Sequence, residues 1–173
     1  PEYLEDNICS VTGICTETEN LKIEITPALR VKLDADIVKS GDSIYVEKIH
    51  ASADIKKLAV QSINADYIFI DGNKFAHKKS SNSSFNLNKI PEINIKRLEY
   101  ISKSINLNIQ DISYDGHLAK FKGEAKTKFL QNKFLGTLEN TGSSVFAQSI
   151  KFGSALSITG KLTDKKGNYD FHV

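Results

Sequence analysis

Two pairs of side chains have residue types and spacings that acid–base chemistry could use. Asp34 and Asp36 are separated by one residue, so in a strand both carboxyl groups would lie on one face. His50 and Asp54 would also share a face, but roughly 13 Å apart at about 3.3 Å per residue, too far for a hydrogen bond. Acidic residues that alternate with apolar ones are typical of the solvated face of a strand. We therefore expect no enzymatic activity, and the sequence contains no GxSxG, Walker, GxGxxG or HExxH motif.

The two cysteines, Cys9 and Cys15, lie close together with Gly13 between them and could close a small loop as a disulfide. Two separate thiols in a reducing compartment are the alternative, because two cysteines do not define a disulfide framework. No second cysteine pair is present, and the histidines are dispersed along the chain at His50, His77, His117 and His172. We expect neither a metal site nor a cofactor.

Composition places the chain among soluble globular proteins of one domain. It has 173 residues, 40% of them hydrophobic and 25% charged, with a formal net charge of +2. So small a net charge predicts no strong field for nucleic acid, and no run of about 18 apolar residues is present to span a membrane. The chain begins at Pro1 and has no methionine, which predicts a processed segment of a longer protein.

Alternation of apolar and polar residues predicts strands along most of the chain. Gly and Asn at turn positions separate the runs, for example in Ser40-Gly41-Asp42 and Asp115-Gly116, which predicts an antiparallel meander. Ile44–Val60 and Ile95–Ile105 can also be read at helical spacing, so one or two short helices are the alternative there. The runs with alternation are Leu29–Ile37, Ile49–Ile55, Ile105–Ile109, Ala119–Phe129, Leu156–Leu162 and Tyr169–Val173.

The chain shows no clear domain boundary. Residues 1–20 have weak periodicity and are predicted to be an irregular segment that carries the cysteine loop. Residues 21–173 are predicted to be a single β-rich domain with an exposed, serine-rich loop at about residues 77–84. Pro91 is expected to mark the start of the next strand. Tyr67–Ile70 is apolar on both faces, which is typical of a central strand.

The apolar strand faces need a cover, which a second sheet, a helix or barrel closure would provide. A curved open sheet would instead leave its apolar face for an acyl chain, at about 0.8 kcal/mol per buried methylene. The pattern alone favours a covered core over such a groove. The candidate groove residues, taken from the cleanest strands, are Leu29, Val31, Leu33, Ile49, Ala51, Ile55, Ile105, Leu107 and Ile109.

The segment Leu21–Phe75 resembles the N-terminal region of AsmA-like proteins. Thr26-Pro27-Ala28-Leu29 matches the TP-x-L segment that leads into an alternating strand in that family. Glu47–Ile55 and Leu58–Ile70 resemble the two strands that follow, and Gly160–Val173 is similar to later strands of such proteins. The resemblance covers about half of the chain.

This resemblance implies a mainly β fold in which an antiparallel meander forms a curved open sheet, a β-groove. It also implies a periplasmic location in a parent protein anchored to the bacterial inner membrane. Its ligand would be a phospholipid or another acyl chain, its partners neighbouring repeats or envelope proteins, and its role lipid transport and outer-envelope maintenance. The alternatives are a structural or protein-interaction β-domain without a ligand, and a small carrier barrel for one hydrophobic molecule.

Overall fold

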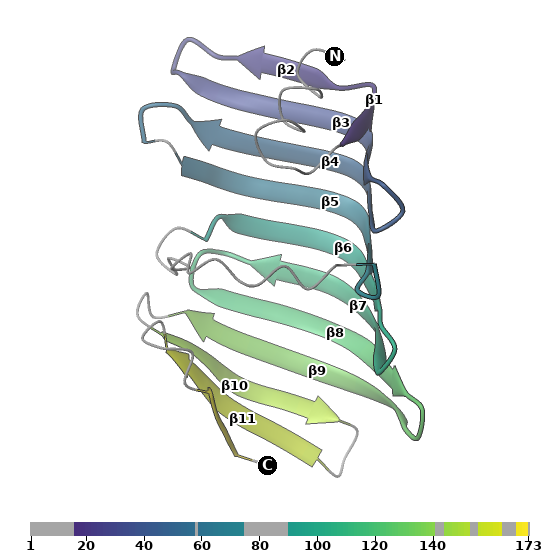
Figure 1. Ribbon diagram of the computed structural model, residues 1–173. Helices are drawn as coiled ribbons and strands as arrows, with labels where there is room; N and C mark the ends of the chain where they lie inside the picture. The colour runs from purple at the N-terminus through teal and green to yellow at the C-terminus, as the bar shows by residue number, and fades with distance from the viewer. Residues whose placement is uncertain are drawn as a thin grey trace.

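The computed structural model describes residues 16–57, 59–74, 90–140, 144–152, 156–163 and 169–172, and all of their strands belong to one sheet (Figure 1). No helix occurs among these residues, which confirms the mainly β prediction and its preference for strand in both ambiguous segments. The strands are β1 Glu17–Glu19, β2 Lys22–Ile25, β3 Arg30–Ser40, β4 Ile44–Asp54, β5 Ala59–Asp71, β6 Glu92–Ile101, β7 Ile105–Tyr114, β8 Leu118–Thr127, β9 Gln131–Asn140, β10 Ser144–Phe152, β11 Leu156–Thr163 and β12 Tyr169–His172.

The sheet is an open meander. Its order is β1-β3-β4-β5-β6-β7-β8-β9-β10-β11-β12, with β2 also paired to β3. Every neighbouring pair is antiparallel except β5 and β6, which run parallel. The first and last described strands lie at opposite ends of the sheet and do not pair, so the described strands form no closed barrel (Figure 1).

The apolar pattern shifts by one residue near the middle of the long strands. On β3, Leu33 and Ala35 share a face by alternation, yet the next apolar residue on that face is Val38, three positions after Ala35. Pairing aligns the shift across the sheet, since Ala35 lies opposite Ile49 and Val38 lies opposite Val46. The strands that follow repeat the spacing at Val46/Ile49, Ala65/Ile68, Ile95/Leu98 and Ile109/Ile112.

The strands bend where the pattern shifts, and the bend closes on the apolar side. Val46, Ala65 and Ile95 are buried there, and partly buried side chains pack against them from both sides of the shift, among them Ile49 and Ile68. Figure 1 shows the long strands turning sharply near the strand ends that the β3–β4 turn joins. The cluster around Val46, Ala65 and Ile95 therefore lies on the inside of the sheet's own bend.

Charged side chains of alternating sign follow the outside of the bend. Lys48 is paired with Asp36, while Lys96 and Asp66 lie 2.8 Å apart, and each pair joins neighbouring strands. A left-handed φ of 52° at Lys48 and at Asp111 interrupts the regular pairing, as in a β-bulge, and re-aims the following side chains. Across β3–β8 the row reads Asp36, Lys48, Asp66, Lys96, Asp111 and Lys122.

Several predicted boundaries need correction. Leu29 lies in the turn before β3 with a φ of 58°, so the strand starts one residue later than its alternation indicates. Ile37 faces the polar side, opposite Glu47, because the bend reverses the alternation. The predicted run Ala119–Phe129 ends as a strand at Thr127. Residues 17–19 of the predicted irregular segment form β1.

Two further expectations concern β5 and β6. β6 begins directly after Pro91, as expected, and Tyr67–Ile70 lies within β5. Cys9, Cys15 and the loop at residues 77–84 lie outside the described residues.

Candidate functional site

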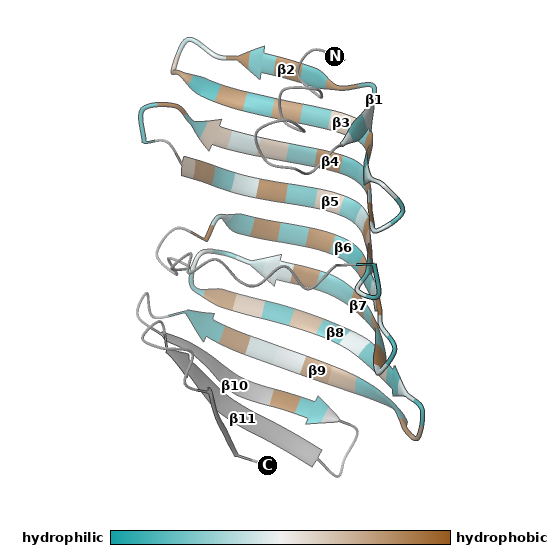
Figure 2. Cartoon of the chain, viewed as in Figure 1, coloured by the Kyte–Doolittle hydropathy of each residue, from teal (hydrophilic) through white to brown (hydrophobic). Residues whose placement is uncertain are grey.

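One face of the sheet is apolar over its whole described length from β3 to β9. We call it the apolar face and the opposite side the polar face, and Figure 2 shows the hydrophobic and hydrophilic bands that alternate along β3–β9. At about 4.8 Å between strands, the seven strands span roughly 30 Å. The apolar face includes Val31, Leu33, Ala35, Val38, Ile44, Val46, Ile49, Ala51, Ala53, Ile63, Ala65, Ile68, Ile70, Ile93, Ile95, Leu98, Ile105, Leu107, Ile109, Ile112, Ala119, Phe121 and Phe134.

The apolar face has no second layer within the described ranges, since every described strand is part of the sheet itself. Away from the bend its side chains are half-buried, as Val31 at one end of β3 and Leu107 on β7 illustrate. An open sheet of this kind presents a long apolar surface whose two halves meet at an angle.

The sequence-predicted groove residues fall into two groups. Val31, Leu33, Ile49 and Ala51 lie on the apolar face of β3 and β4, and Ile105, Leu107 and Ile109 lie on the apolar face of β7. Leu29 and Ile55 instead lie in turns, 43% and 39% exposed, where a backbone hydrogen bond of 3.0 Å joins them as a continuation of the β3–β4 pairing.

Two phenylalanine rings cover glycines at the β8–β9 end of the apolar face. Phe134 lies over Gly123 and Phe121 lies over Gly136, each in the neighbouring strand, and the two rings meet edge to face with centroids 6.1 Å apart. None of these four residues is among the predicted groove residues. The alternation of glycine and phenylalanine in both strands was the available signal, but its meaning depends on the register between them.

A buried polar pair lies where β7 and β9 end, at Tyr114 and Asn140. The Asn140 side-chain amide donates to the Tyr114 hydroxyl at 2.6 Å, and that hydroxyl donates to the Gly116 carbonyl at 2.8 Å. This gives the apolar face a defined polar limit where β7, β8 and β9 meet their turns.

The polar face carries aromatic side chains among its charges. The Tyr67 ring lies edge to face with Tyr45, and the Arg97 guanidinium lies 5.6 Å from its centroid. Burial, together with the hydrogen bond that its hydroxyl donates to Glu99 at 2.9 Å, raises the pKa of Tyr67 to about 12. A hydrogen bond to Glu47 raises the pKa of Tyr45. Each of these side chains has a partner within the sheet.

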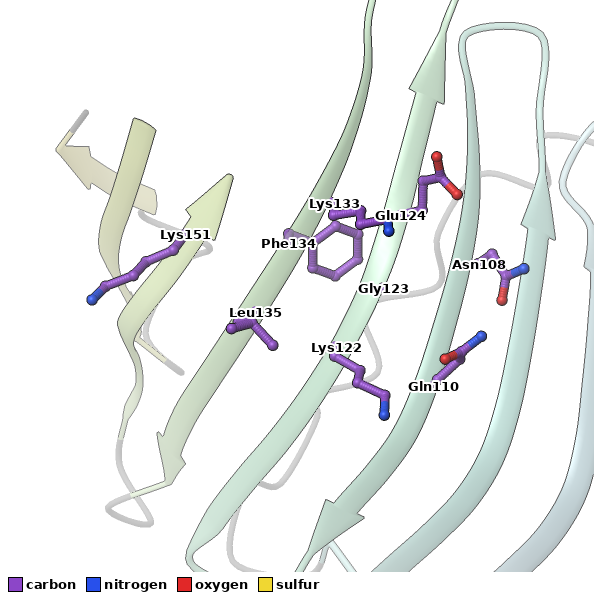
Figure 3. A pocket seen from close by; sticks show the side chains of 9 residues that line it. All are labelled: Asn108, Gln110, Lys122, Gly123, Glu124, Lys133, Phe134, Leu135 and Lys151. Carbon is purple, nitrogen blue, oxygen red and sulfur yellow. The ribbon is translucent and has the colours of Figure 1, made fainter. Parts of the chain in front are cut away.

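A shallow cavity of about 550 Å³ lies over β7–β10, and Figure 3 shows the side chains around it. Its polar residues belong mainly to the polar face, and Leu135 stands among them 61% exposed. The residues are Asn108, Gln110, Lys122, Gly123, Glu124, Lys133, Phe134, Leu135 and Lys151.

The acid–base candidates take partners on the polar face. His50 Nδ1 lies 2.5 Å from the Asp34 carboxylate on β3, and Asp54 lies opposite Arg30. Asp36 pairs with Lys48, and the hydrogen bond from that ammonium lowers the pKa of Asp36. Among the described residues, no three His, Cys, Asp or Glu side chains are grouped to hold a metal ion.

No protein-family model matches the chain, and no curated protein or solved structure matches it either. No helix within the described ranges is long and apolar enough to cross a membrane.

Proposed function

We propose that this chain is a non-enzymatic lipid-binding segment of the AsmA-like type, in which the apolar face holds the acyl chains of phospholipids. The segment would work in the periplasm as part of a protein anchored to the inner membrane, in lipid transport and maintenance of the outer envelope. The observation that carries this proposal is the apolar face itself, which extends over seven strands without a described layer against it.

The dimensions of this face suit acyl chains. The hydrocarbon core of a bilayer is about 30 Å thick, so one acyl chain extends about half of the roughly 30 Å that β3–β9 span. Burying about ten methylenes would be worth about 8 kcal/mol before the cost of ordering the chain is subtracted. A gain of this size supports specific retention by shape and apolar area, without any polar catalytic group.

The open ends of the sheet suit a segment of a longer assembly. Exposed strand edges present unpaired backbone groups and favour pairing with another strand. On β2, at one end, Ile23 is 47% exposed and Ile25 is 65% exposed. Neighbouring repeats or other envelope proteins are therefore the partners that we propose for these ends.

Two aspartate substitutions on opposite parts of the apolar face test the proposal. Val31→Asp and Leu107→Asp place a charge on half-buried positions of β3 and β7. On an open face the charge keeps access to water, so both variants should fold and lose bound phospholipid. Leu135→Asp is the matched control, because Leu135 is 61% exposed on the polar face.

The readouts are circular dichroism for folding and lipid extraction with mass spectrometry for phospholipid per chain. If both apolar-face variants unfold while the control folds, the face is a covered core and the proposal is wrong. Folded variants with unchanged lipid content would also contradict it.

A further inference from the structure

The turn between β8 and β9 carries two large apolar side chains at its tip. Phe129 is 89% exposed and Leu130 is 57% exposed, and they follow Lys128 in the turn where β8 ends and β9 begins, on the same side of the sheet as the β3–β4 turn (Figure 1). Phe129 is the most exposed large apolar residue in the part of the chain that the structure describes.

Forming this turn does not require an apolar tip. The Thr127 amide donates to the Leu130 carbonyl at 2.7 Å, and the Leu130 amide donates to the Thr127 hydroxyl at 3.0 Å. Neighbouring described turns at this end, Ser40–Ser43 and Ser102–Ile105, are closed by comparable hydrogen bonds and consist mainly of polar residues. The formation of the turn therefore does not explain why Phe129 and Leu130 are apolar.

Three lysines lie in the turn or on the strands that it joins. Lys126, Lys128 and Lys133 are exposed, and the Lys128 ammonium lies 5.6 Å from the Phe129 ring centroid. None of the three takes part in an ion pair with a described residue. The net charge of +2 for the whole chain thus conceals a locally cationic turn with an apolar point.

We propose that the segment Lys126–Lys133 docks on the surface of an anionic lipid bilayer. Phe129 and Leu130 would enter the boundary between headgroups and acyl chains, while the lysine ammonium groups would contact lipid phosphates. Exposed apolar side chains beside lysines suit that boundary, because the apolar side chains can be buried beneath anionic headgroups that the lysines contact. Docking at this turn goes beyond the proposed binding of acyl chains on the apolar face and does not rest on it.

The small size of the tip favours a bilayer over a protein partner. A specific protein interface buries about 800 Å² on each partner, and one aromatic side chain supplies about 150–250 Å². The turn has two exposed apolar side chains, Phe129 and Leu130, with polar or charged residues around them. A bilayer needs no matching surface around the inserted side chains.

A single tryptophan probe tests insertion directly, because the chain has no tryptophan of its own. Phe129→Trp should show a blue-shifted emission with vesicles of 70% phosphatidylcholine and 30% phosphatidylglycerol, and a smaller shift as salt is raised. Leu135→Trp, on the polar face of β9 and 61% exposed, is the control and should not shift. Equal shifts for both probes, or no shift for Phe129→Trp, would overturn the proposal.

Co-sedimentation with the same vesicles measures the contribution of each side chain. Phe129→Ser and Leu130→Ser should each weaken vesicle binding about tenfold, since each removes an inserted apolar side chain. Lys128→Gln should weaken it about fivefold on anionic vesicles only. Each variant should keep the wild-type melting temperature, because these side chains are exposed.

Two further results would overturn the proposal. Binding that is unchanged in Phe129→Ser would place the membrane contact elsewhere. A concentration-dependent dimer that Phe129→Ser abolishes, in a chain that does not bind vesicles, would assign the tip to contact between copies. A chain that docks on vesicles but carries no lipid on its apolar face would contradict the proposed function and leave the docking proposal intact.

Discussion

Alanine at the two glycines beneath the phenylalanine rings tests whether the apolar face is open. At Gly123 a Cβ atom would lie 2.5 Å from the Asn108 carbonyl oxygen, a backbone atom that cannot move alone. At Gly136 the Cβ would lie 2.2 Å from the Phe121 ring, which can rotate if the space above it is open. The two substitutions therefore meet obstacles of different stiffness.

The expected costs follow from that difference. Overpacking against a fixed neighbour costs about 1–3 kcal/mol, and displacing a side chain from its rotamer costs about 0.5–1.5 kcal/mol. Replacing glycine by alanine also lowers the conformational entropy of the unfolded chain, which raises the free energy of unfolding by about 0.4–1 kcal/mol. We expect Gly123→Ala to lower the free energy of unfolding by about 2 kcal/mol and Gly136→Ala by less than about 1 kcal/mol.

Urea unfolding followed by circular dichroism measures both values. In the double variant Phe121→Ala/Gly136→Ala the obstacle is gone, so adding Gly136→Ala to Phe121→Ala should cost nothing further. If Gly136→Ala is as destabilising as Gly123→Ala, the Phe121 ring has no room to rotate. The apolar face would then be covered, and our reasoning about its openness would be refuted.

Three further outcomes are expected. The pKa of Tyr67 is raised to about 12 in the folded chain, so the unfolded chain loses this proton first as the pH rises above 10. The free energy of unfolding should therefore fall between pH 10 and pH 12. Urea unfolding at pH 9 and pH 11 should show a smaller fall for Tyr67→Phe than for wild type. Asp111 has a left-handed φ of 52°, which a β-branched side chain disfavours. Asp111→Val should therefore lower the free energy of unfolding by about 1–2 kcal/mol, while Asp111→Gly should stay within about 1 kcal/mol of wild type. Equal losses in the two variants would contradict backbone strain at this position. Backbone hydrogen bonds from Leu118 and His117 lower the pKa of Asp115, so stability should fall as the pH drops below about 4. Thermal melts of Asp115→Asn should show a smaller change of melting temperature with pH below that value.

Alternation in the sequence predicted runs that overlap β3, β4, β7, β8, β11 and β12, whereas no predicted run covers β9 or β10. Alternation was insufficient for the bend, although the signal was present in the spacing of three between Ile95 and Leu98. The same spacing made Ile95–Ile105 readable as a helix, because three residues is also close to a helical turn. Only the register, which places Ile95 beside Ala65 and Leu98 beside Ile68, identifies the spacing as a bend.

Other features depend on pairing between strands, which the sequence pattern does not specify. The role of Gly123 depends on Phe134 in the next strand, and the ion pairs on the outside of the bend join residues such as Asp66 and Lys96 from strands that are far apart in the sequence. Alternation does not describe the parallel pairing of β5 and β6 either. The position of Phe129 at a tip rather than in a strand follows from the Thr127 hydrogen bonds that end β8.

Native mass spectrometry of the 173-residue chain, purified from a bacterial periplasm with lipid extraction alongside, tests the central claim most directly. We predict that phospholipid accompanies the chain at a defined stoichiometry, and that Leu107→Asp removes it while Leu135→Asp retains it. A wild-type chain that is folded and carries no lipid would contradict the claim that the apolar face holds acyl chains.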